Sequence, residues 1–260
     1  MLVGAICRAV SKRTKFPYTP LLLMVGMALG HFRHYLSAVG DGADIMSKMN
    51  PHMILFVFIP ILIFESGFNC DWYVFKKEIV NILLLAAPGV LWGALLIAFC
   101  FKSILGYEEL SWNEALTLGC VLSATDPVAV VALLKELGAS VRFNTLIEGE
   151  SLLNDGTAMV FFMMFLEMVK GNTSTAGAVI MNFIRIGLGG PLLGVCVGLV
   201  AAYYLKKVVR DDVMTANITF LACYFCFWLA EYTFLKVSGI LSIVVLGLFL
   251  SAMARTRIHP

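Results

Sequence analysis

The sequence is poor in charged residues. Only 14% of its 260 residues are Asp, Glu, Lys or Arg, whereas 60% are hydrophobic, and the mean hydropathy is +0.89. Soluble domains carry roughly 25% charged residues, so this composition argues against a soluble domain. The apolar runs are also long and continuous, without the alternation of barrel strands. The sequence therefore predicts an all-α polytopic membrane protein.

Several other features are missing. No linker, low-complexity stretch or block of like charge divides the chain, which predicts one membrane domain over residues 1–260 and no nucleic-acid partner. We expect no signal peptide in residues 1–15, because Leu2 to Cys7 is too short an apolar region and its basic cluster follows it. The seven cysteines are scattered, and the Cys223–Cys226 pair has no second pair or nearby histidine, which argues against a metal site.

Membrane-length apolar runs are abundant. About 20 apolar residues cross a hydrocarbon core of about 30 Å. Eight such runs cover residues 17–36, 51–69, 79–101, 113–135, 150–169, 178–205, 213–235 and 237–254. Residues 1–10 could be the end of a further helix. We therefore predict about eight transmembrane helices plus a partial first one.

Basic residues are distributed unevenly between the two sides of this arrangement. Of the 19 Lys and Arg residues, 13 fall in alternate loops and termini. These are Arg8, Lys12, Arg13, Lys15, Lys76, Lys77, Lys135, Arg142, Lys206, Lys207, Arg210, Arg255 and Arg257. The positive-inside rule places that side in the cytoplasm. A glycosylation sequon at Asn172 then falls on the outside, whereas a second match at Asn217 lies within a span and is set aside.

Two acidic runs interrupt the apolar spans, at residues 123–127 and 148–155. A carboxylate at bilayer depth costs roughly 2.5–3.5 kcal/mol on insertion scales, so such clusters usually mark an ion or proton path. In the first run, Thr125 and Asp126 precede Pro127, which cannot donate a backbone hydrogen bond. We expect the helix to break there, with free carbonyls able to bind a cation. Asp126 could alternatively serve only as a helix cap.

The second run offers oxygen ligands on one helix face. Ser151, Asn154 and Asp155 are spaced i, i+3, i+4, and Glu150 lies beside that face. Hard cations such as sodium take hydroxyl, amide and carboxylate oxygens. Desolvation disfavours a charged carboxylate, so a proton and a cation would compete for the same group. Glu148 could simply lie at the cytoplasmic interface.

Other polar or small residues have plainer explanations. Ser123 and Thr125 taken alone would bond to their own helix. Glu65, near the end of the second span, either reaches the interface or hydrogen-bonds the polar face of the fifth span, and we expect the second. A four-residue repeat of glycine on the sixth span predicts close helix packing. The repeat consists of Gly190, Gly194 and Gly198.

The motifs Ala124–Val130 and Gly149–Gly156, supported by Pro60–Glu65, resemble those of monovalent cation/proton antiporters of the sodium/proton exchanger type. The sequence at residues 133–140 is most similar to those of the subgroup that contains sperm-specific and plant plasma-membrane exchangers. The resemblance covers essentially the whole chain. It implies a homodimer with a thirteen-helix fold of two inverted repeats. This chain would be a truncated part of that fold, without the last helices.

The resemblance also implies roles for individual residues. Asp155 would bind sodium or a proton in alternation, and Asn154, where electrogenic relatives have a second Asp, implies electroneutral exchange. Glu65 would hold Asn154, and Glu150 would pair with an arginine beyond Pro260. The implied sodium ligands are Asp155, Asp126, Ser151 and the Thr125 carbonyl.

The implied function is secondary active exchange of Na⁺ for H⁺ across the plasma membrane, which regulates intracellular pH and sodium without a cofactor. K⁺ and Li⁺ remain open as alternative cations. A non-transporting truncated isoform that associates with a complete exchanger is the alternative, and we expect these 260 residues alone not to exchange ions. An intramembrane hydrolase with Ser151 as nucleophile lacks a His or Lys base at matching depth. We therefore do not expect an enzyme.

Overall fold

The computed structural model describes residues 2–14, 18–31, 42, 45, 48–50, 53–107, 109–127, 130–131, 133–134, 137–171, 176–208 and 211–254. The chain divides into two compact units, Met1–Phe58 and Ile59–Pro260. In the first unit, α1 (Leu2–Thr14) packs against α2 (Tyr18–His31), and the π-helical turn η2 covers Ile54–Phe58.

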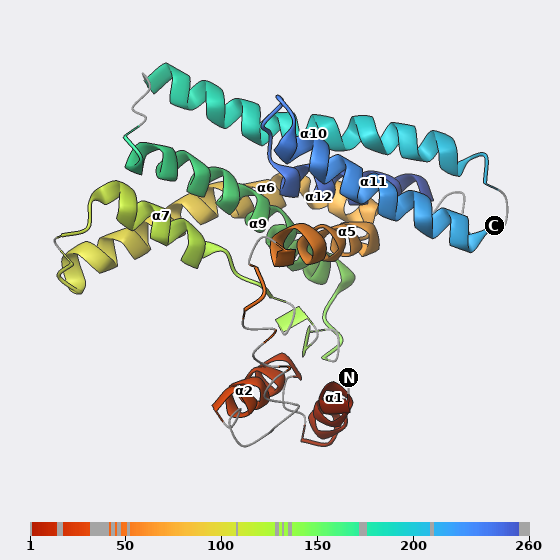
Figure 1. The fold of residues 1–260 in the computed structure, drawn as a ribbon, viewed down its shortest axis with the longest axis horizontal. Coiled ribbons are helices and arrows are strands. Elements are labelled where there is room, and N and C mark those ends of the chain that lie inside the picture. The colour runs from red at the N-terminus through yellow and green to blue at the C-terminus, as the bar shows by residue number, and fades with distance from the viewer. Residues whose placement is uncertain are drawn as a thin grey trace. The chain divides into compact units, whose positions relative to one another are not determined.

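The second unit consists of helices in its described residues (Figure 1). They are α5 (Ile59–Asn69), α6 (Trp72–Phe99), the π-helical turn η3 (Cys100–Ile104), α7 (Trp112–Ser123), α9 (Val141–Val169), α10 (Ala176–Leu205), α11 (Asp212–Tyr232) and α12 (Gly239–Ala254). Helices α6, α7 and α9 pack against one another, and α12 packs against α5, α10 and α11. Contacts of α9 with α10 and α12 join the two groups.

Local sequence fixes where these helices begin. The Asp71 carboxylate accepts hydrogen bonds from the backbone N–H groups of Tyr73 and Val74 at the start of α6. At α7, Ser111 and Glu114 form a reciprocal capping box. The Ser140 hydroxyl accepts a hydrogen bond of 3.3 Å from Phe143 N at the start of α9. Such caps satisfy backbone donors that a helix leaves unpaired, so these starts follow from short-range sequence.

Two apolar clusters hold the second unit together. Phe75 and Ile82 of α6 are buried with Leu152 and Leu153 of α9 and Val244 of α12. A second cluster joins α6, α7 and α9, and its buried members are Val90, Ala94, Cys120, Ala158, Phe161 and Phe165. Helix α9 contributes to both clusters, so its acidic segment is held between packed neighbours.

The helices confirm the all-helical class, support most of the predicted spans and correct several of their bounds. Among the described residues four helices are long and apolar enough to cross a membrane, namely Trp72–Ile104, Val141–Val169, Met181–Leu205 and Asp212–Tyr232. Shorter apolar helices cover Pro20–His31, Phe56–Asn69 and Gly239–Met253. Two predicted spans, 79–101 and 150–169, begin too late, because the hydropathy pattern stopped at charged residues that the helices include in their early turns. The predicted span 113–135 is not continuous, since α7 ends at Ser123.

The glycine repeat lies where α10 crosses α12, which confirms the packing prediction. A Cβ added at Gly190 would lie 2.8 Å from the Ser238 carbonyl oxygen, and one at Gly194 would overlap the Ser242 carbonyl oxygen. At Gly198 an added Cβ would reach the Phe249 ring. Small residues here let the two backbones approach closely.

Candidate functional site

The helix break predicted at the first acidic run is present. Helix α7 ends at Ser123, and Ala124 to Pro127 are non-helical. The Ser123 hydroxyl donates a hydrogen bond of 3.0 Å to the Val90 carbonyl of α6, a neighbouring helix, where back-bonding within its own helix was expected. Helical bonding resumes with Val131 N donating to the Pro127 carbonyl at 2.8 Å. Thr125 and Asp126 thus lie on unwound backbone between two helical segments.

The second acidic run lies in the middle of α9. Because α9 begins at Val141, Glu148 is two turns inside the helix and Asp155 lies near its centre. The Thr157 hydroxyl lies 2.9 Å from the Ala86 carbonyl oxygen of α6 and 3.0 Å from the Asn154 carbonyl oxygen of α9. This contact ties α9 to α6 beside the acidic segment.

Two neighbouring faces of α9 carry the predicted site residues. Asn154 is only 2% exposed, and its side-chain N–H donates to the Glu150 carboxylate at 3.2 Å. Its Oδ1 atom has no hydrogen-bond partner among the described residues. On the adjacent face Ser151 is half-buried and Asp155 is exposed. The Asp155 carboxylate therefore remains open to a ligand, whereas the Asn154 amide is enclosed.

A cavity of about 470 Å³ adjoins the Asn154 face. Its polar lining comes from Glu150 and Asn154 of α9 and from Ser123 and Thr125 at the helix break. The α6 wall of the cavity is formed by Leu85, Gly89, Val90, Gly93 and Ile97. The cavity thus brings Thr125 and Glu150 together, two residues that are 25 positions apart in the sequence.

The carboxylates of the two acidic runs lie within electrostatic range of each other. Asp126 and Glu150 are the like-charged groups that act on the Asp155 side chain. A bound cation would reduce the repulsion between such like charges. The roles predicted for Asp126, Glu150 and Asp155 stay predictions: Thr125 and Glu150 line the cavity, whereas Asp126 and Asp155 do not.

Glu65 does not take the predicted place. It is exposed on α5, and within the described part of the chain it makes no hydrogen bond to Asn154. Glu150 accepts the Asn154 hydrogen bond instead, because the two residues are one helical turn apart and share a face. The candidate glycosylation residue Asn172 lies outside the described residues.

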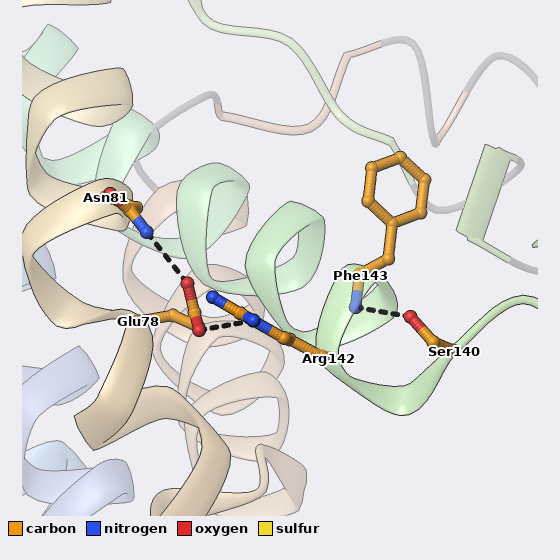
Figure 2. A network of polar contacts seen from close by, with 5 residues as sticks. All are labelled: Glu78, Asn81, Ser140, Arg142 and Phe143. Carbon is orange, nitrogen blue, oxygen red and sulfur yellow. Dashed lines mark hydrogen bonds and ion pairs between the residues drawn. The ribbon is translucent and has the colours of Figure 1, made fainter.

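One polar group at the start of α9 escaped the sequence prediction (Figure 2). The Glu78 carboxylate accepts a hydrogen bond of 2.8 Å from the Asn81 amide and lies 2.5 Å from the Arg142 Nε atom. Its side chain is 7% exposed, whereas that of Arg142 is 74% exposed. Residue spacing could not predict this ion pair, because Glu78 and Arg142 come from different helices. The pair links the base of α6 to the base of α9.

Comparison with known proteins gives consistent matches. A family model described as "Sodium/hydrogen exchanger, transmembrane" matches residues 1–259. Sodium/hydrogen exchanger 8 of Arabidopsis thaliana is 40% identical over 260 residues, covering 98% of this chain and 34% of that protein. The low-affinity Na⁺/H⁺ antiporter NhaS1 of Synechocystis is 36% identical over 253 residues, covering 95% of this chain and 44% of that protein.

The fold also has a solved counterpart. The sodium proton antiporter MjNhaP1 of Methanocaldococcus jannaschii superposes with a TM-score of 0.72 at 19% identity, over 98% of this chain and 60% of that one. At this identity the likeness shows the fold alone. The present chain spans about a third of the length of the plant relative. With the family match over nearly its whole length, the chain belongs to the sodium/hydrogen exchanger transmembrane family.

Proposed function

We propose that this chain supplies the cation site of a secondary active antiporter that exchanges Na⁺ for H⁺. The observation that carries the proposal is the cavity that Thr125, on the unwound backbone, lines together with Glu150 and Asn154 of α9, a membrane-length helix with Asp155 at its centre. Asp155 binds either a sodium ion or a proton. Ser151, Asp126 and the Thr125 carbonyl supply the further oxygen ligands that a hard cation needs. The relatives named as Na⁺/H⁺ exchangers support this choice of ions.

The proposed exchange is electroneutral. Asn154 offers an amide that carries no charge and is already engaged with Glu150. Asp155 is then the carboxylate that exchanges its occupant, so one sodium ion replaces one proton without moving net charge. K⁺ or Li⁺ would satisfy the same oxygen ligands, and a competition assay among the three cations distinguishes them.

We further propose that the protein acts in the plasma membrane as a homodimer and regulates intracellular pH and sodium. Exchange of sodium for protons changes both quantities directly on the cytoplasmic side. The alternative is a non-transporting chain that associates with a complete exchanger. Reconstitution in liposomes distinguishes the two possibilities, because only an exchanger requires ion flux through the proposed cation site.

The test uses proteoliposomes that contain a pH-sensitive dye and receive a step of external sodium. One sample holds the 260-residue chain, and another holds a chimera in which residues 1–259 replace the matching part of the Synechocystis antiporter. We expect sodium-driven pH changes from the chimera, insensitive to membrane potential because exchange is electroneutral. We expect no sodium-driven flux with Asp155→Asn, which keeps side-chain shape but removes the titratable carboxylate.

The matched control is Asp212→Asn, which removes an exposed carboxylate in the first turn of α11. It should retain the flux of the unchanged chimera. Sodium-driven proton flux that survives Asp155→Asn would refute the role assigned to Asp155. An inactive chimera that carries the unchanged Asp155 and is correctly inserted would favour the non-transporting alternative.

A further inference from the structure

A second cavity lies in the same unit, apart from the candidate cation site. Its volume of about 790 Å³ is within the range of about 300–1,000 Å³ that is typical of ligand pockets. Helices α6, α9, α10 and α12 each contribute one face to its lining. It shares no lining residue with the cavity beside Asn154, so the two cavities are separate.

The lining of this cavity is almost entirely hydrocarbon. Among its side chains only Thr157 carries a hydroxyl and only Trp72 carries an N–H group. The Thr157 hydroxyl lies 2.9 Å from the Ala86 carbonyl oxygen, so it is already engaged. A polar molecule would lose its hydrogen bonds to water here without replacing them, and the cavity therefore favours an apolar occupant.

The cavity is elongated along the helices that cross the membrane. On α6 its lining begins at Trp72, in the first turn, and continues to Ala87, a rise of about 22 Å at 1.5 Å per residue. On α12 the lining extends from Leu241 to Met253. The cavity thus covers more than half of a hydrocarbon core of about 30 Å, a shape that suits an extended acyl chain.

Several lining residues are open to the bilayer. Leu83 of α6 and Ile184 and Leu188 of α10 are exposed although they line the cavity. In the hydrocarbon region the surrounding solvent is lipid, without water. A lipid tail can therefore enter the cavity sideways past these side chains.

A basic residue lies at one end of the cavity. Lys76 is exposed, and it follows Trp72 by four residues and precedes Ile79 by three, on the α6 face that lines the cavity. Long side chains on a helix lean toward its N-terminus, so the Lys76 ammonium group extends toward the end marked by Trp72. The distribution of basic residues predicts this end to be cytoplasmic, and the cytoplasmic leaflet carries anionic lipids.

We propose that this cavity binds an acyl chain of an anionic phospholipid from the cytoplasmic leaflet, and that Lys76 holds the lipid headgroup. The apolar lining selects the tail, whereas the ammonium group of Lys76 selects a negative charge on the headgroup. The site uses none of the residues assigned to cation exchange, so its occupancy does not depend on the proposed function.

The test uses the 260-residue chain in phosphatidylcholine nanodiscs. A small fraction of the lipid is a probe with a diazirine at the end of one acyl chain and either a phosphatidylserine or a phosphatidylcholine headgroup. After irradiation, peptide mass spectrometry locates the adducts and measures their amounts. We expect adducts on the lining residues, about fivefold more with the serine probe, which is the scale of attraction to one lysine near the membrane surface.

The tail site is tested by filling the cavity with Gly187→Leu. A Cβ at this lining position meets nothing within 4 Å, so the new side chain extends into open space. We expect it to reduce adducts on the lining residues at least fivefold, while adducts at exposed Trp92, on the opposite face of α6, stay unchanged.

Gly177→Leu is the matched control for the tail site. It also lies on α10 with open space at its Cβ position, but it does not line the cavity. This variant should be labelled as the unchanged chain is. Adducts on the lining residues that persist in Gly187→Leu, or that fall equally in both variants, would overturn the tail site.

The headgroup contact is tested with Lys76→Gln, which should bring the ratio of serine-probe to choline-probe adducts close to one. Lys76→Arg keeps the charge and should keep the ratio. Lys77→Gln is the matched control, because the Lys77 Nζ atom lies over the Tyr73 ring, 4.2 Å from its centroid. Equal labelling by the two probes in the unchanged chain, or equal effects of the two glutamine substitutions, would refute the role of Lys76.

The same labelling in the chimera with the Synechocystis antiporter distinguishes a lipid from a segment of protein as the occupant. A lipid site should keep its adducts in the chimera. Adducts that occur in the 260-residue chain but are absent from the chimera would show that protein covers the cavity, and would overturn the proposal. None of these measurements uses ion flux, so they stand even where the exchange function fails.

Discussion

At the scale of single residues, the Thr157 hydroxyl is a notable link between helices. Its oxygen lies within hydrogen-bond distance of two carbonyl oxygens, those of Ala86 on α6 and Asn154 on α9. A hydroxyl donates one hydrogen bond at full strength, so the two acceptors share it. The carbonyl of Asn154 is thereby coupled to a neighbouring helix.

Removing this hydroxyl should loosen that coupling. We expect Thr157→Val, which keeps the side-chain shape, to reduce the free energy of unfolding by about 1 kcal/mol because the interhelical hydrogen bond is lost. Thr157→Ser retains the hydroxyl and should lie much closer to the unchanged protein. Thermal unfolding in detergent measures both. Equal stability of the valine and serine variants would show that the hydrogen bond contributes nothing.

Asn154 shows how far sequence reasoning reaches for a single side chain. The i, i+3, i+4 pattern grouped Asn154 with Ser151 and Asp155, but it did not predict that Asn154 is enclosed while Asp155 is exposed, and the predicted partner Glu65 was wrong. The observed partner Glu150 is spaced i, i+4 and could have been found from that spacing. Glu65 required knowledge of how α5 lies against α9, which no local pattern contains.

At the scale of elements, the contact between α10 and α12 depends on glycine. An alanine at Gly194 would place its Cβ against the Ser242 carbonyl oxygen and the Leu246 nitrogen, both of which are backbone atoms. Backbone atoms cannot rotate away as a flexible side chain can. The two helices would have to separate, with loss of the buried contacts along the crossing.

We therefore expect Gly194→Ala to reduce the free energy of unfolding by about 1–3 kcal/mol, as overpacking generally does. Gly187→Ala on the same helix is the matched control, since a Cβ there meets nothing within 4 Å. The control should be neutral or stabilising by up to about 1 kcal/mol, because alanine is the better helix former. Similar unfolding curves for the two variants would contradict the close contact.

The bounds of α7 and α9 were predictable to different degrees. Pro127 marked the break after α7 from sequence alone, because proline removes a backbone donor wherever it occurs. The start of α9 at Val141 was missed, although Ser140 is a common capping residue. The hydropathy pattern placed the start of this helix at residue 150, where the continuous apolar run begins. The helix itself begins nine residues earlier.

At the scale of the whole molecule, sidedness stays a prediction from charge. The sequon at Asn172 offers a direct test, because glycosyl transfer occurs only on the luminal side. Expressed in eukaryotic cells, the protein should run with added mass that is removed by a glycosidase and absent in Asn172→Gln. Asn217→Gln removes the second match, within α11, and should leave the modification intact. Added mass that disappears only with Asn217→Gln would reverse the predicted sidedness.

The sequence by itself determined the membrane class, the approximate spans, the broken helix at Pro127 and the oxygen-rich face of α9. These follow from composition, from proline chemistry and from helical spacing, which act over one or two turns. Only the tertiary structure decided that Thr125 and Glu150 line one cavity, that Asn154 is enclosed while Asp155 is exposed, and that Arg142 pairs with Glu78. Contacts between helices depend on how apolar faces and glycines pack, and that packing is set by many distant residues together.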